Sequence, residues 1–166
     1  MNEYNPPVII QPGIATSAWD DNASYRVLVA DDDDGVRFMN AGMLTRSGYQ
    51  VDSAADGEAA WQALNNESYD LLITDHNMPR LTGTELIKKM RAARITIPVI
   101  LASGNPPNDE FNLCPWLRPA ATLVKPYTVA KLLGTVTEVL RSSHDAPIAA
   151  VPPTHGNRAS VDAPVP

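Results

Sequence analysis

The stretch RVLVADDDDGVR, Arg26 to Arg37, joins a short run of strand-forming residues to four consecutive aspartates. The first part, Arg26–Ala30, is the kind of continuous apolar run that forms a strand buried on both faces. The third and fourth aspartates, Asp33 and Asp34, suit the start of a helix, where negative charge interacts favourably with the helix dipole. The first two stand directly at the strand end, where carboxylates repel one another unless a cation lies among them.

Strand and helix signals alternate along the rest of residues 25–141. Four further segments indicate strands, the first of them only weakly: QVDSA at 50–54, DLLITD at 70–75, IPVILAS at 97–103 and ATLVK at 121–125. Between them, apolar residues recur at helical spacing, and Asp56 and Thr82 are suitable N-caps. The alternation predicts an α/β fold, a doubly wound parallel sheet of five strands with helices on both faces.

The segment between the last two predicted strands carries four prolines within SGNPPNDEFNLCPWLRPAA, residues 103–121. Proline removes a backbone donor and clashes with the preceding turn of a helix. We therefore predict a fourth helix that is short or distorted, around Asn108–Leu113, with a loop beyond it. Phe111, Trp116 and Leu117 either pack against the sheet or form a patch for a partner.

Composition and the two ends of the chain narrow the class of protein. The chain has 166 residues, a net charge of -6 and one cysteine. These features disfavour binding to nucleic acid or to a membrane and fit a reducing compartment. With no signal-peptide pattern and no apolar run long enough to span a bilayer, we expect a cytoplasmic protein. We expect residues 1–24 to form a flexible arm, residues 25–141 one domain, and the Pro/Ala-rich residues 142–166 a disordered tail.

Polar residues stand at the ends of four predicted strands, in chain order Asp31 and Asp32, Asp75, Ser103 and Lys125. Because the carboxyl ends of parallel strands meet at one edge of a sheet, we expect these side chains to converge there. Carboxylate oxygens suit Mg²⁺. Mg²⁺ beside a carboxylate, an ammonium and a hydroxyl is typical of phosphoryl transfer, in which an aspartate can itself be the nucleophile.

In these motifs the chain resembles the receiver domain of two-component response regulators. The matching segments are VLVADD, DGEAAWQAL, YDLLITDHNMPRLTG, IPVILASG and LVKPY, in the order and at the approximate spacing of the family. The resemblance covers about residues 25–141. It implies a flavodoxin-like sheet with strand order 2-1-3-4-5. It also implies a signalling domain that accepts phosphate, and not an enzyme acting on other substrates.

The resemblance further implies how the acidic residues work. Asp75 would accept the phosphoryl group from a phosphohistidine on a histidine kinase or a histidine phosphotransfer protein. Mg²⁺ would be bound by Asp32, by Asp75 and by the backbone carbonyl of Asn77, and Asp31 would act through a metal-bound water.

Two further residues would contact the phosphoryl group. Lys125, aimed by a cis peptide before Pro126, would pair with the phosphoryl oxygens, or with Asp75 when the site is empty. Ser103 would swing inward to hydrogen-bond the phosphate. At Thr122 the chain departs from the family, which commonly has there a tyrosine or phenylalanine that rotates on phosphorylation. A conformational switch in this chain would therefore have to use a smaller side chain or a different mechanism.

From these features we expect a stand-alone receiver that takes part in a phosphorelay. Phosphorylation of Asp75 would change its binding to an unidentified output protein. Two alternatives stay open. A degenerate receiver would be an interaction module that never takes up phosphate, and Thr122 and the proline-broken helix leave room for it. A small aspartyl-phosphate hydrolase would usually carry a second aspartate two residues after the nucleophile, where this chain has Asn77.

Overall fold

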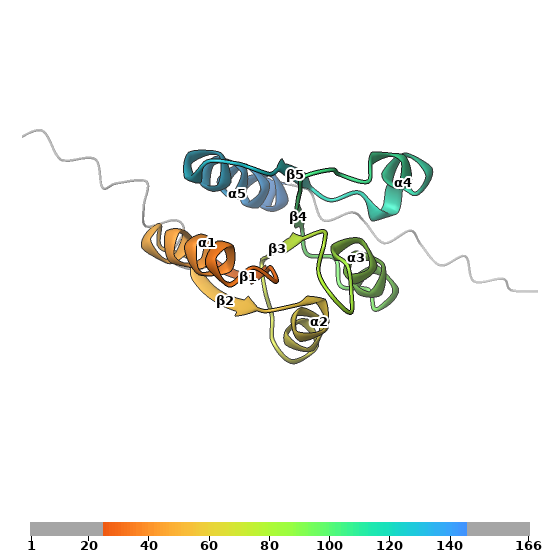
Figure 1. Cartoon of the computed structure of the whole chain (residues 1–166), viewed down its shortest axis with the longest axis horizontal. Helices are drawn as coiled ribbons and strands as arrows, with labels where there is room; N and C mark the ends of the chain where they lie inside the picture. Colours follow the sequence, from red (N-terminus) through yellow and green to blue (C-terminus); the bar gives the residue numbers. More distant parts are fainter. Residues whose placement is uncertain (1–24, 146–166) are drawn as a thin grey trace, which may run out of the picture.

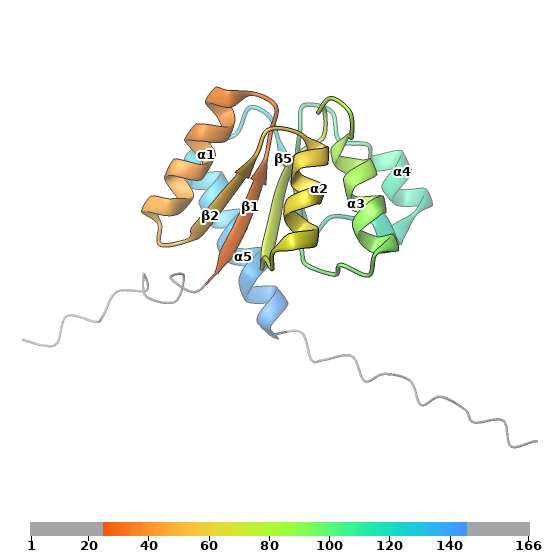
Figure 2. The ribbon, with the colours of Figure 1, turned by 90° about the horizontal axis from the view of Figure 1, so that it is seen from below.

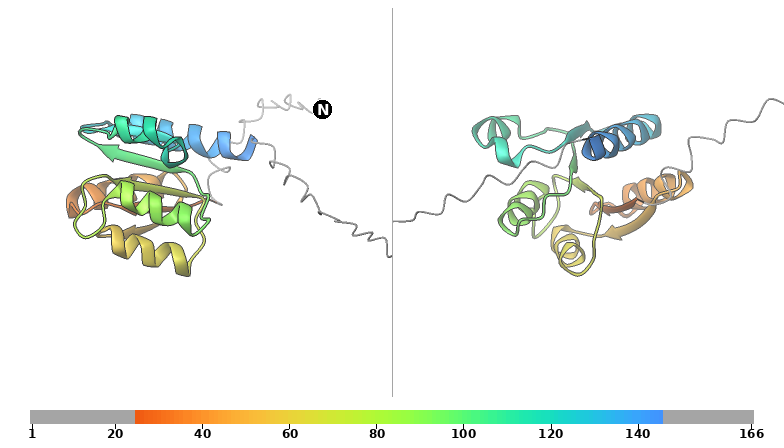
Figure 3. Two further views of the ribbon diagram at one scale, coloured as in Figure 1. Left: turned by 90° about the vertical axis from the view of Figure 1, so that its right-hand side faces the viewer. Right: turned by 180° about the vertical axis from the view of Figure 1, so that it is seen from behind.

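The structure is a computed structural model that describes residues 25–145. The expected N-terminal arm, and residues 146–166 of the expected tail, lie outside the described residues. Within them a parallel sheet lies between two layers of helices, as the sequence predicts (Figure 1). Views from the side and from behind show the same layering (Figure 3).

Strands and helices alternate along the described residues. The strands are β1 (Arg26–Ala30), β2 (Gln50–Ala54), β3 (Leu71–Asp75), β4 (Val99–Ser103) and β5 (Ala121–Val124). The helices are α1 (Asp34–Arg46), α2 (Gly57–Asn66), α3 (Gly83–Ala92), α4 (Asn108–Leu113) and α5 (Val129–Asp145), with one 3-10 turn, η2 (Pro115–Leu117), after α4. Of these helices, none has the length and apolar character that crossing a bilayer requires.

The order of the strands in the sheet is β2-β1-β3-β4-β5, and all neighbours are parallel, which confirms the predicted topology. The register aligns the strand ends. Ala30 of β1 lies opposite Thr74 of β3, and Ser103 of β4 lies opposite Val124 of β5. Each of these residues is the last or next to last of its strand, so the segments that follow leave the sheet at one edge.

Each face of the sheet is covered by its own apolar cluster. Leu72 faces α2, α3 and α4, and its neighbour Ile73 faces the opposite side, as alternating side chains of a strand do. On that opposite side, Leu44 of α1 and Leu132 of α5 complete the second cluster. Figure 1 shows α1 and α5 on one side of the sheet and the other helices on the second. Because both faces are covered, every residue of β3 and β4 is buried.

The fourth helix is short, as its prolines predict. It covers Asn108–Leu113, so it begins directly after Pro107 and ends two residues before the proline that begins η2. Phe111 and Leu117 are buried in the cluster that also contains α2 and α3, whereas Trp116 is 60% exposed. The packing interpretation therefore holds for the first two residues, and Trp116 lies on the surface.

The first residue of α3 is a glycine that closely approaches the end of β3. A Cβ built on Gly83 would lie 2.9 Å from Leu101 Cδ1 and 3.1 Å from the carbonyl carbon of Asp75, and it would overlap the Asp75 carbonyl oxygen. A Cβ on Gly134, in α5, would meet nothing within 4 Å.

We expect Gly83→Ala to lower the free energy of unfolding by about 1–3 kcal/mol, since the added methyl group overpacks a close backbone contact. Gly134→Ala is the matched control, and it should raise that free energy by up to about 1 kcal/mol through helix propensity. Urea denaturation of both variants measures the difference. A Gly83→Ala protein as stable as the wild type would contradict the close approach.

Candidate functional site

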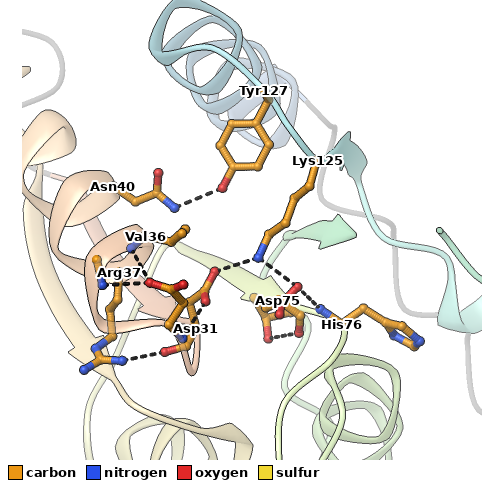
Figure 4. A network of polar contacts seen from close by, with 11 residues as sticks. Asp31, Val36, Arg37, Asn40, Asp75, His76, Lys125 and Tyr127 are labelled. Atoms are coloured by element: carbon orange, nitrogen blue, oxygen red, sulfur yellow. Dashed lines mark hydrogen bonds and ion pairs between the residues drawn. The ribbon is translucent and has the colours of Figure 1, made fainter. Parts of the chain in front are cut away.

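Acidic and basic side chains from separate strands meet at the carboxyl edge of the sheet (Figure 4). Carboxylate oxygens of Asp31, Asp32 and Asp75 all lie within 4.8 Å of one another. The Lys125 Nζ atom lies 2.9 Å from Asp31 Oδ2 and 3.1 Å from Asp75 Oδ1. Four of the residues singled out in the sequence are thus brought together.

The four aspartates after β1 divide into two pairs with different surroundings. Asp31 is buried, and its amide donates to the carbonyl of Ala54, which extends the pairing of β1 with β2. Asp32 is exposed. Asp33 is the N-cap of α1, where its side chain accepts hydrogen bonds from the amides of Gly35 and Val36. The predicted helix start at the second pair is confirmed, and the first pair faces the site.

Asp31 is held from several directions. Its Oδ1 accepts from the Asp33 amide at 3.0 Å, and its Oδ2 accepts from Lys125. Its backbone carbonyl accepts from Arg37 Nη1 at 2.7 Å. Burial raises the pKa of Asp31, and the hydrogen bond from Lys125 opposes that shift. Both carboxylate oxygens of this residue are therefore already engaged by the protein.

Asp75 is the last residue of β3 and is buried like the rest of that strand. Its Oδ1 accepts from the amide of His76 at 2.8 Å and also contacts Lys125. Among the described residues, no hydrogen bond reaches its Oδ2. One oxygen is thus held by the fold, and no hydrogen bond from the described residues holds the other.

Lys125 follows β5 directly. Its amide donates to the carbonyl of Ser103 at 2.9 Å, which continues the pairing of β5 with β4, and the peptide bond to Pro126 is cis, as expected. Burial alone would lower the pKa of Lys125, but hydrogen bonds to Asp31 and Asp75 outweigh it, so the pKa is raised. The side chain is therefore a stable ammonium at neutral pH.

Two other predicted site residues lie near the cluster without joining it. Ser103 ends β4 and is fully buried, and its Oγ accepts a hydrogen bond from the amide of Asn105 at 3.1 Å. This contact is the local turn bond that a serine at a strand end commonly makes. Asn77 is exposed in the loop after β3, two residues beyond Asp75.

Thr122 lies in the middle of β5, opposite Leu101, and is partly buried. It borders a hollow of about 440 Å³ that is also lined by Phe111, Asn112 and Arg118. The small threonine side chain thus stands beside open space next to α4.

Sequence reasoning missed several contacts that build the site. Asn40 of α1 is buried and donates from Nδ2 to the Tyr127 hydroxyl at 3.0 Å, which ties α1 to the segment after Lys125 (Figure 4). The signal for it was a polar residue between Val36 and Leu44 at helical spacing. The carboxylates of Asp31 and Asp75 also accept hydrogen bonds from backbone amides. Every residue except proline has such an amide, so these contacts cannot be read from the sequence.

The four side chains that meet at this edge carry a net negative charge. Three carboxylates face one ammonium, and carboxylate oxygens are the ligands that Mg²⁺ prefers. Opposite ligands in a Mg²⁺ shell are about 4 Å apart, close to the spread of these oxygens. The exposed side of Asp32 leaves room for the waters that Mg²⁺ keeps. The residues present therefore fit this ion.

The chain is similar to known proteins over the same region. The sequence profile described as the response regulator receiver domain matches residues 27–137. The sensor protein EvgS of Escherichia coli is 33% identical over 129 residues, which are 73% of this chain and 10% of EvgS.

Two solved structures share the fold. The chemotaxis response regulator CheY4 of Vibrio cholerae is 30% identical, with a TM-score of 0.63 over 69% of this chain and 98% of CheY4. The response regulator TrrA of Thermotoga maritima, solved in complex with Mg(2+)-BeF, is 28% identical, with a TM-score of 0.61 over 69% of this chain and 98% of TrrA.

The chain spans only a tenth of EvgS, but it spans nearly the whole of CheY4 and TrrA. In all three comparisons the similarity covers about seven tenths of this chain. By profile, by relatives and by fold, the chain belongs to the response regulator receiver domain family.

Proposed function

We propose that the chain is a phosphorylation switch in which Asp75 accepts a phosphoryl group from a phosphohistidine, with Mg²⁺ bound beside it. One observation carries the proposal: Lys125 Nζ reaches both Asp31 and Asp75 while three carboxylate oxygens lie within 4.8 Å. The family consists of signalling domains, and the complex of TrrA with Mg(2+)-BeF supports the choice of ion.

The contacts suggest which residues would hold the ion. Asp32 is exposed, so it can bind Mg²⁺ directly. Asp75 would bind the ion through the carboxylate oxygen that does not react with phosphorus. Both oxygens of Asp31 are already hydrogen-bonded, which suits a contact through water. The backbone carbonyl of Asn77 would be a further ligand. When bound, Mg²⁺ would neutralise charge on the phosphoryl oxygens.

In the transfer itself, the free oxygen of Asp75 forms a bond to phosphorus as the bond from phosphorus to the donor imidazole nitrogen breaks. The leaving nitrogen keeps the electron pair and takes up a proton from solvent. Lys125 would compensate the negative charge of the phosphoryl oxygens. Ser103 would turn away from the Asn105 amide, and its hydroxyl would donate a hydrogen bond to a phosphate oxygen.

Phosphorylation adds between one and two negative charges beside Lys125 and Ser103. Ser103 ends β4 and Lys125 follows β5, so their movement would alter the surface around β4, β5 and α4. We propose that this change alters binding to an output protein. Because EvgS is a sensor protein, we propose a histidine kinase or a histidine phosphotransfer protein as the phosphoryl donor. We further propose that the protein acts in the cytoplasm and that neither nucleic acid nor a membrane is its partner.

Hydrolysis of external phosphate esters has less support. The position two residues after Asp75, where an acid/base carboxylate would assist such a reaction, is an asparagine. A receiver that takes up no phosphate is the alternative that the first experiment below tests.

We expect the wild type, incubated with Mg²⁺ and a small phosphodonor, to gain the mass of one phosphoryl group, because Asp75 Oδ2 is free and Lys125 is in place. Asp75→Asn should gain none. Intact mass spectrometry measures the product, with circular dichroism as the control for folding. Equal labelling of both proteins, or no labelling of a folded wild type, would contradict the proposal.

A second prediction concerns the ion pair between Lys125 and Asp31. Lys125→Met leaves the buried Asp31 carboxylate without its cation, so the free energy of unfolding should fall by about 1–3 kcal/mol at pH 7 without divalent ions. The double variant Asp31→Asn/Lys125→Met should recover most of the loss, because both charged partners are then gone.

Urea denaturation of the wild type, the two single variants and the double variant gives the coupling between the two residues. If the decrease in the free energy of unfolding of the double variant equals the sum of the two single decreases, Asp31 and Lys125 do not stabilise each other.

A further inference from the structure

The loop between β3 and α3, residues 76–82, carries Asn77, whose carbonyl is assigned to Mg²⁺ above. One residue in this loop has an unfavourable backbone. Arg80 has a φ of 66°, in the left-handed region that non-glycine residues rarely adopt. Such a conformation costs free energy and persists only where surrounding contacts hold it.

The contact that holds Arg80 comes from α2. Its guanidinium forms an ion pair with Asp56 Oδ2, and the side chain of Asp56 is 9% exposed while that of Arg80 is 67% exposed. Asp56 is the N-cap of α2, and its Oδ1 accepts from the Ala59 amide at 2.8 Å. The carboxylate is therefore buried and anchored to a helix, and it restrains the more exposed arginine.

A second contact joins the same two segments. A Cβ built on Gly57, the first residue of α2, would lie 2.8 Å from Leu81 Cβ and 2.9 Å from the Leu81 carbonyl carbon. The start of α2 thus abuts the loop at Leu81, directly after Arg80. Figure 2 shows the beginning of α2 beside the segment that enters α3. Two successive loop residues are fixed by one helix start.

We propose that Asp56 and Arg80 are positioning residues for the divalent-cation site, and that their ion pair keeps the loop in the shape that presents the Asn77 carbonyl to Mg²⁺. This inference rests on the proposed function. Neither side chain contacts the ion. Both act through the backbone between Asn77 and Leu81.

Mg²⁺ affinity, measured by isothermal titration calorimetry on the full chain, tests the proposal. Asp56→Asn keeps a good helix cap but removes the charge that pairs with Arg80. Asp56→Asn and Arg80→Ala should each weaken Mg²⁺ binding about two- to fivefold, the range expected of an ion pair with one exposed partner. The double variant should bind no more weakly than either single variant, and Arg80→Lys should recover part of the loss.

If the variants changed Mg²⁺ affinity only through the net charge near the site, the two single variants would differ in sign. Loss of a positive charge in Arg80→Ala would tighten Mg²⁺ binding, whereas loss of a negative charge in Asp56→Asn would weaken it. Arg94→Ala is the matched control, since Arg94 is also an exposed arginine with a left-handed φ, 62°, but lies just after the far end of α3. It should leave the affinity unchanged.

Thermal unfolding without Mg²⁺ verifies that each variant is folded, and amide NMR spectra without Mg²⁺ should show shifts confined to the start of α2 and residues 76–82. Arg80→Ala binding Mg²⁺ as tightly as the wild type, or additive losses in the double variant, would overturn the inference alone. A wild type with no saturable Mg²⁺ binding would overturn the proposed function as well.

Discussion

The ammonium group of Lys125 allows carboxylates from separate strands to share one buried edge of the sheet. It lies 2.9 Å from Asp31 Oδ2 and 3.1 Å from Asp75 Oδ1. Lys125 follows the edge strand β5, and its side chain reaches past β4 to residues that follow β1 and end β3. The same contact therefore joins three strands and compensates part of the negative charge of the three carboxylates at this edge. The remaining negative charge is what a divalent cation would neutralise.

This convergence could be predicted from the sequence because it depends only on the order of elements. Once strands and helices alternate, the sheet is parallel and all strand ends that carry polar residues lie at one edge. Asp31, Asp75 and Lys125 each stand at such an end. The short fourth helix could be predicted for an equally local reason, since its prolines limit it at both sides.

Other parts of the site depend on packing between segments distant in sequence, which periodicity does not reveal. The hydrogen bond between Asn40 and Tyr127 and the ion pair between Asp56 and Arg80 each join a helix to a loop. The left-handed backbone of Arg80 has no glycine to mark it. For Ser103, strand position predicted the location of the side chain, but the hydroxyl bonds to the Asn105 amide.

We propose that carboxylates from two separate segments bind one divalent ion within reach of one ammonium. Amide NMR spectra of the full chain, recorded during a Mg²⁺ titration and then with beryllofluoride added, test it most directly. We expect saturable shifts from a single site at residues 31–32, 75–77 and 125, and beryllofluoride should extend them to Ser103. Shifts that do not saturate, or that gather on acidic residues away from this edge, would contradict it.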